Sequence, residues 1–260
     1  MAGSLTAWFF KCMDSPCTLV FRVPRGVSMS RKKAGLPVWL GMLVAIAFSV
    51  VSPGLLAAEE EVNSNTLASG AEVVLNGIGE ARELTGSVYL GALYLEHRSN
   101  NPDVVVTSIW SKRLSMRVSA DKVYGRRLGQ MWRERIAINS DRKLVTDLGK
   151  EIMQFVDTFK QTYLKGDQID IDFTPEKGTT ISVNGTTIGR IKRPELYELL
   201  LRAWVGEKPP TAQFKVGVMG NADDVTAIAL QHQFATLKPT PKRVAETNGW
   251  ALRNELANGS

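Results

Sequence analysis

Two aspartates spaced two residues apart are the first residues whose type and spacing suggest chemistry. Asp170 and Asp172 stand in the segment 168–173, and a pair of neighbouring carboxyl groups is what acid–base cleavage of a glycosidic bond requires. In this segment they alternate with three apolar residues. Such alternation places both carboxylates on the face of a strand opposite the core. We therefore expect a solvated strand face here and no catalytic pair.

The other polar side chains predict no metal, cofactor or nucleophile site. His97 follows the end of a predicted strand and His232 lies in the weakly patterned C-terminal part, and two isolated histidines do not make a metal site. Both cysteines, Cys12 and Cys17, stand near the N-terminus, so the rest of the chain has no thiol chemistry. Gly77-Ile78-Gly79 lacks the third glycine of a dinucleotide motif. We expect no catalytic residue, no metal and no cofactor.

A group of basic residues before and within a predicted helix is the strongest charge feature. Its members are Lys112, Arg113, Arg126, Arg127, Arg133 and Arg135. The group could hold a phosphate or an anionic head group, although a solvated helix face is the commoner outcome. It lacks the interleaved aromatic residues that stack on bases. We therefore expect a solvated face and no nucleic-acid partner.

The N-terminal 58 residues have the order of a secretory signal. Three basic residues at 31–33 precede an apolar run over 36–51, a helix-breaking Ser52-Pro53-Gly54 and a small-residue cleavage site at Ala57 or Ala58. The run is shorter than the ~20 residues that span a bilayer. We predict a gene-model extension at 1–28 and a signal peptide at 29–58, with an uncleaved membrane anchor as the alternative. A bacterial periplasmic or secreted protein follows from this.

Composition limits what the rest of the chain is. The 260 residues are 44% hydrophobic and 22% charged, which excludes wholesale disorder. The net charge is +6, but residues 1–57 hold six basic residues against one acidic residue, so the remainder is nearly neutral. That balance again argues against nucleic acid as a partner.

Hydrophobic patterning over 65–220 predicts an α+β domain. Strands are expected at 73–75, 88–95, 104–106, 114–118, 168–173, 180–183, 186–188 and 214–216, and helices at 119–136, 147–163 and 194–206. Asn184-Gly185 favours a type I′ hairpin turn, and the glycines at 77 and 79 a turn or bulge. A linker at 59–64 precedes the domain, and a loose, weakly patterned tail at 221–260 follows it.

Several motifs in this order resemble the chalcone isomerase-like domain family. They are Leu75-Asn76-Gly77-Ile78-Gly79, the strand 88–96, Lys165-Gly166-Asp167-Gln168-Ile169, the segment 178–185, Ala203-Trp204-Val205-Gly206-Glu207 and Met219-Gly220. The resemblance implies an open-faced β-sandwich, in which a large antiparallel sheet packs against a layer of helices and the ligand cleft lies between them. It implies either cyclisation of chalcones by conjugate addition or binding of fatty acids.

The site residues that the resemblance implies are only partly present. The family's arginine falls on Ala81, with Arg82 beside it, and a shift of one residue turns a strand side chain to the other face. The strand threonine falls on Tyr89 and the helix tyrosine near Tyr124, while the asparagine falls near Gln130 or Met131. One tyrosine without the cation gives a phenolate little stabilisation.

We therefore expect a secreted, non-catalytic protein that binds a small apolar or amphipathic molecule, such as a fatty acid, in the cleft. Arg82, Tyr89 and Tyr124 are the predicted ligand contacts. The alternatives are an intramolecular lyase or isomerase of unknown substrate, and an envelope protein that binds a partner. Whether a reaction is catalysed, and the oligomeric state, stay open at this point.

Overall fold

A computed structural model describes residues 62–84 and 86–258 of the chain, and the side chains as far as residue 251. The predicted gene-model extension and signal peptide lie outside these residues. Of the predicted linker at 59–64, only the last three residues are described, where Val62 is buried and Ser64 begins a strand. Within the described part of the chain, no helix is both long and apolar enough to span a membrane.

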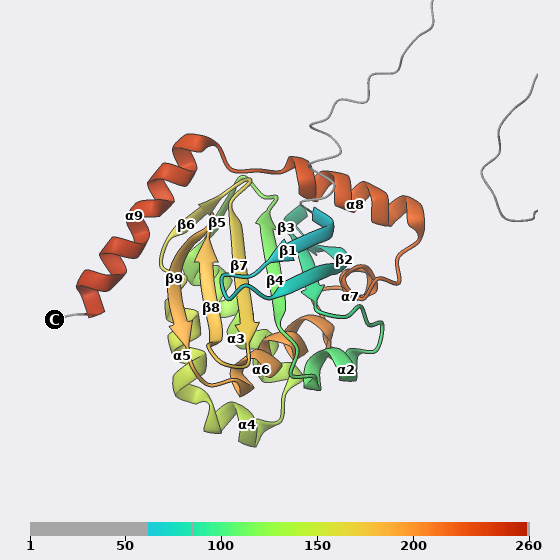
Figure 1. Ribbon diagram of the computed structural model, residues 1–260, viewed down its shortest axis with the longest axis horizontal. Coiled ribbons are helices and arrows are strands. Elements are labelled where there is room, and N and C mark those ends of the chain that lie inside the picture. Colours follow the sequence, from blue (N-terminus) through green and yellow to red (C-terminus); the bar gives the residue numbers. More distant parts are fainter. Residues whose placement is uncertain (1–61, 85, 259–260) are drawn as a thin grey trace, which may run out of the picture. The chain divides into compact units, whose positions relative to one another are not determined.

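A seven-stranded antiparallel sheet forms the centre of the fold (Figure 1). Its strands follow the order β1-β2-β3-β4-β7-β8-β9. Their bounds are β1 Ser64–Thr66, β2 Glu72–Glu83, β3 Gly86–Leu95, β4 Lys112–Val118, β7 Gln168–Thr174, β8 Gly178–Val183 and β9 Thr186–Ile191. A separate pair consists of β5 (Lys122–Tyr124) and β6 (Thr162–Leu164). Every strand pair is antiparallel, so the α+β class predicted from the sequence is confirmed.

Helices cover one face of the sheet and reach both of its edges. Their bounds are α2 Pro102–Thr107, α3 Gly125–Asn139, α4 Arg142–Asp147, α5 Gly149–Asp157, α6 Glu195–Val205, α7 Ala212–Val218, α8 Asp224–Thr236 and α9 Pro241–Asn258. Helices α3, α5 and α6 form the layer behind the sheet in Figure 1, while α7 and α8 lie against β2 and α9 against β9.

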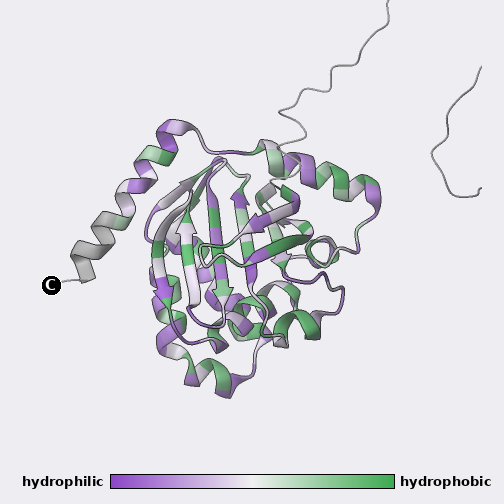
Figure 2. Ribbon diagram, in the orientation of Figure 1, coloured by the Kyte–Doolittle hydropathy of each residue, from purple (hydrophilic) through white to green (hydrophobic). Residues whose placement is uncertain are grey.

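The main core lies between the sheet and the helical layer. On β4 the apolar residues Leu114, Met116 and Val118 face it, and on β7 Ile169 and Ile171 do the same. Strands β4 and β7 therefore alternate in hydropathy, as Figure 2 shows. The predicted hairpin between β8 and β9 is confirmed: Asn184 and Gly185 have φ values of 48° and 84°, as a type I′ turn requires.

On β4 and β7 the second face of the sheet is polar but not solvated, which corrects our expectation for Asp170 and Asp172. Each of these residues is only 7% exposed. The Arg113 guanidinium donates two hydrogen bonds of 2.6 and 2.8 Å to Asp172, and the Ser115 hydroxyl donates one to Asp170. Burial raises the pKa of Asp172, and Arg113 partly offsets that rise. The aspartates are structural because their partners are already in place.

Two predicted strands are helices, because local caps outweigh their strand-like composition. The Asn101 side chain accepts hydrogen bonds from the amides of Asp103 and Val104, which starts α2 where a strand at 104–106 was expected. Thr211 caps α7 in the same way, over the strand expected at 214–216. A short apolar run does not separate the two structures by itself.

Two predicted helices have different bounds from those expected. Residues 122–124 pair with 162–164 as β5 and β6, so α3 begins at Gly125 and not after Ser119. The same pairing shortens the helix predicted at 147–163 to α5, which spans Gly149–Asp157. The separate helix α4 ends at Asp147, where the predicted helix begins. In contrast, the helix predicted at 194–206 matches α6, whose C-cap is Gly206.

The C-terminal residues are not a loose tail. The Arg117 guanidinium, on β4, donates to the carbonyl oxygens of Phe234 and Leu237 at the end of α8, and it lies 4.5 Å from the Phe234 ring centroid. Leu230 and Phe234 pack on the second face of the sheet. Periodicity missed α8 because most of its first half is exposed, including Val225 and Ile228.

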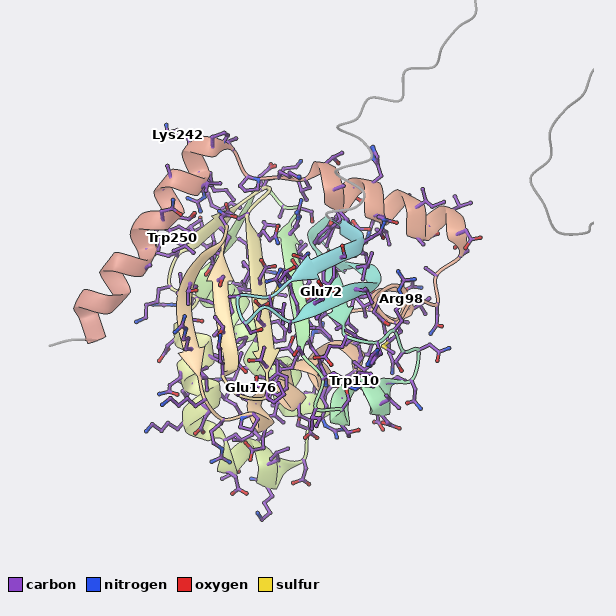
Figure 3. All side chains as sticks on the ribbon, viewed as in Figure 1. Glu72, Arg98, Trp110, Glu176, Lys242 and Trp250 are labelled. Atoms are coloured by element: carbon purple, nitrogen blue, oxygen red, sulfur yellow. The ribbon has the colours of Figure 1, made fainter. Side chains whose placement is uncertain are left out.

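Helix α9 is held by a buried ion pair. Asp167, which is fully buried, accepts hydrogen bonds from Nε and Nη2 of Arg243 at 2.7–3.0 Å. Asn184 and the Leu164 amide also donate to this carboxylate. Trp250, labelled on α9 in Figure 3, adds an edge contact with the Tyr163 ring.

Lys112 is a buried cation whose pH response can be predicted. Its ammonium group donates to the carbonyl oxygens of Val105 and Ser108, at 2.5 and 2.7 Å, and thereby holds the end of α2. Burial lowers its pKa from 10.5 to about 8. Between these values the unfolded chain still binds the proton that the folded chain has lost, so raising the pH favours the folded state.

We therefore expect the stability of the wild type, relative to a Lys112→Met variant, to rise as the pH rises from 8 to about 10. Urea unfolding of both proteins across this range measures the difference. The variant is the reference for the wild type, because every titrating group other than Lys112 is common to both chains. A difference that stays constant with pH would contradict the prediction.

Candidate ligand site between the sheet and the helices

The space between the sheet and the helical layer is filled by stacked aromatic rings. The Tyr89 ring, on β3, stacks on Trp204 of α6 with centroids 6.2 Å apart, and Trp204 stacks on Trp132 of α3 at 6.0 Å. Beside these rings lies a cavity of about 10 Å³, which Met116 and Met131 also line. A cavity of that volume is at the lower limit for one water molecule. The cleft is therefore closed to anything larger in this conformation.

Helix α7 closes the cleft at a point where glycines permit close approach. A Cβ atom on Gly79 of β2 would lie 2.9 Å from the Phe214 Cα, and one on Gly91 would lie 2.7 Å from the Phe214 ring. Phe214 is fully buried and meets the Trp204 ring edge-on at 5.0 Å. The glycines of the two long strands therefore seat α7 and its phenyl ring against the aromatic stack.

Two uncharged polar groups belong to this site, in addition to the Arg135 side chain that also lines the cavity. Burial raises the pKa of Tyr89 far above its usual range, so its phenol stays protonated. The indole Nε1 of Trp132 is buried and donates to no acceptor among the described residues. A buried donor without an acceptor is unfavourable by about 1–3 kcal/mol. The site therefore offers one unused N–H and one neutral hydroxyl to an incoming acceptor.

Of the three ligand contacts predicted from the sequence, only Tyr89 lines this cavity. Arg82 is 65% exposed and pairs with Glu80 at 2.7 Å. A register irregularity does occur between Ala81 and Arg82, but Arg82 lines a different groove, between α7 and α8. Tyr124 precedes α3 and is 61% exposed, with the Lys122 ammonium 5.8 Å from its ring centroid. The structure does not bring these three side chains together.

The predicted basic group is divided by the fold, which corrects our expectation of one solvated face. Arg126, Arg127 and Arg133 are exposed on α3. Lys112 and Arg113 are on β4, Lys112 fully buried and Arg113 half-buried. The sixth member, Arg135, is half-buried and lines both the aromatic cavity and a neighbouring surface groove of about 680 Å³.

Sequence reasoning missed Arg135 and gave Trp132 too small a role. The apolar stripe of the helix, at Leu128, Trp132 and Ile136, was visible in the sequence and is buried as expected. Arg135 adjoins this stripe at the helical spacing of i and i+3 from Trp132. The sequence contains that spacing, but we assigned Arg135 to the same group as the exposed arginines Arg126, Arg127 and Arg133.

An antiparallel sheet and a helical layer, with stacked aromatic rings between them, define an open-faced sandwich. The chain belongs to the chalcone isomerase-like family, whose model matches residues 57–220. The resemblance stated from the sequence is thereby confirmed, while α8 and α9 lie beyond the matched residues.

Among solved structures, the chain is similar to a fatty-acid binding protein of Arabidopsis thaliana. The two are 16% identical with a TM-score of 0.46, over 65% of this chain and 99% of the other. A comparison with curated proteins gives no match. Among the described residues there is also no group of side chains that could hold a metal ion.

Proposed function

We propose that this protein binds a small amphipathic molecule, such as a fatty acid, whose apolar part enters the cleft between the sheet and the helices. The observation that carries the proposal is the buried indole N–H of Trp132, which has no acceptor among the described residues and lies at an aromatic-lined cavity. Natural folds rarely leave a buried donor unpaired without a reason. A carboxylate, carbonyl or hydroxyl oxygen of a ligand would satisfy it.

Binding requires the lining side chains to move, because the cavity of about 10 Å³ is far below the 300–1,000 Å³ of usual ligand pockets. Two of the lining residues, Met116 and Met131, are unbranched and adapt readily to a new shape. Of the contacts predicted from the sequence, Tyr89 belongs to the proposed site. Arg82 and Tyr124 lie outside this cavity, and a role for them in ligand binding stays a prediction.

The first experiment is native purification of residues 59–260 followed by mass spectrometry of an organic extract. One co-purifying amphiphile at near-stoichiometric amount would support the proposal and name the ligand class. A clean apo-protein whose melting temperature no lipid or chalcone shifts would contradict it.

Trp132→Phe is expected to weaken binding of the identified ligand about tenfold, because it removes one buried N–H donor and keeps an aromatic ring. Isothermal titration measures the affinity. The matched control is Trp110→Phe, since Trp110 is half-exposed in the loop before β4 and meets the His97 ring edge-on, away from the cleft (Figure 3). Equal affinities for the two variants would show that the Trp132 N–H does not contact the ligand.

A second candidate function is the binding of a protein partner in the cell envelope. The closed cleft and the exposed apolar side chains of Val225 and Ile228 on α8 favour it. An isomerase would need a cation at the reacting oxygen. Arg82, which the sequence suggested for that role, pairs with Glu80 and lies outside the cavity, whereas Arg135 lines it.

We also propose that the protein is exported. Its support is the order of basic, apolar and small residues at 31–58.

A further inference from the structure

A surface groove of about 680 Å³ lies beside the closed cleft. It runs between α3, the loop that joins α6 to α7, and α7 itself. Its apolar lining includes Ile138, Val216 and Met219, and its charged lining includes Arg135, Lys208 and Lys215. This volume is within the range of small-molecule pockets, which the cavity in the cleft is not.

Arg135 stands between the groove and the cavity, because its side chain lines both. Its Nη1 donates to the carbonyl oxygens of Lys208 and Pro209, at 3.2 and 2.6 Å, and its Nη2 donates to that of Pro210 at 3.5 Å. These bonds use at most three of the five N–H groups of a guanidinium. They fix the orientation of the Arg135 guanidinium and leave at least two of its N–H groups for a ligand.

Among the described residues, the lining of the groove carries a net positive charge. Among the described side chains, the ion pairs join other arginines and lysines, and none of them includes Arg135, Lys208 or Lys215. The ammonium of Lys215 donates to the Gly206 carbonyl oxygen. Glu207 is the single carboxylate in the described lining, against three cations.

We propose that this groove binds the anionic head of the ligand and that Arg135 selects for it. The proposal rests on the proposed function, because it assumes that the apolar part of the same molecule enters the cleft. Trp132 and Arg135 line the same cavity, so the two oxygens of one carboxylate can accept from the indole N–H and from the guanidinium. A planar guanidinium held by carbonyl groups is suited to a carboxylate, to which it donates charge-assisted hydrogen bonds. Arg135 would then make the protein bind an acid more tightly than a neutral molecule of the same chain length.

The experiment compares decanoate with decan-1-ol, which share an apolar chain and differ in the charge of the head. Isothermal titration gives both affinities for the wild type, Arg135→Met, Arg135→Lys and Arg133→Met. We expect the wild type to prefer decanoate, and Arg135→Met to lower the ratio of the two affinities about tenfold or more. Because both probes meet the same folded variant, the ratio is insensitive to any loss of stability.

Arg133→Met is the matched control, since Arg133 is two residues away on α3, exposed, and outside the groove lining. It should keep the wild-type ratio, and Arg135→Lys should retain a preference for decanoate because it keeps the charge. An unchanged ratio in Arg135→Met would overturn the role of Arg135, even if both affinities fall by the same factor. Failure of the wild type to bind either probe would instead overturn the proposed function.

Discussion

Gly79→Ala is expected to lower the free energy of unfolding by about 3 kcal/mol, at the upper end of overpacking effects. A Cβ atom at this position would lie 2.9 Å from the Phe214 Cα and closer still to its carbonyl oxygen. Both are backbone atoms of α7, so no side-chain rotation relieves the clash. Helix α7 has to move away from β2, and the Phe214 ring loses its place against Trp204.

The control for this variant is Gly149→Ala. Gly149 is the first residue of α5, and a Cβ atom added there would meet open space, with no neighbouring group within 4 Å. Alanine stabilises a helix relative to glycine, so this change should be neutral or raise stability by up to about 1 kcal/mol. Urea unfolding compares the two. Equal stabilities would show that α7 does not depend on close backbone approach to β2.

Arg243→Met is expected to cost about 3–5 kcal/mol of stability, because it leaves the Asp167 carboxylate buried without its cation. Asp167 is fully buried and keeps hydrogen bonds only from neutral donors in the variant, the Leu164 amide and the Asn184 side chain. The same change removes the bond from Arg243 to the Thr162 carbonyl oxygen. Chemical denaturation followed by circular dichroism measures the loss.

Arg193→Met provides the comparison, because Arg193 also pairs with a carboxylate, that of Glu195, at 3.2 Å. Both side chains of this pair are about half exposed, and exposed pairs contribute at most about 1 kcal/mol. A loss at Arg243 no larger than that at Arg193 would mean that water reaches Asp167 once α9 is loosened.

Much of the sheet could be predicted from the sequence, because its signals are local. The alternation at 168–173 and the Asn184-Gly185 turn each depend on neighbouring residues, and both are found as expected. The error at Asp170 and Asp172 has a different origin. Alternation correctly placed them opposite the main core, but it contains no information on a second layer that covers that face.

The site was harder to predict because its geometry comes from distant segments. The family's motifs pointed to the space between sheet and helices and to Tyr89, which lines the cavity there, but the Arg82 side chain pairs with Glu80. Arg135 lies next to the apolar stripe of the helix, but its contacts come from the carbonyl groups of residues 208–210, which are more than 70 positions away in the chain. No spacing rule within the helix predicts that contact.

The contacts of α8 and α9 also have a consequence for the order in which the protein folds. Arg117 and Asp167 lie within the family-matched residues, yet hydrogen-bond partners of both come from segments that follow those residues in the chain, at Phe234, Leu237 and Arg243. Until residues 234–243 are in place, the sheet carries a cation and a carboxylate whose burial is unfavourable. The family-matched part of the sheet therefore closes only after α8 and the start of α9 have been synthesised, so its folding waits for residues that the family's own motifs do not include.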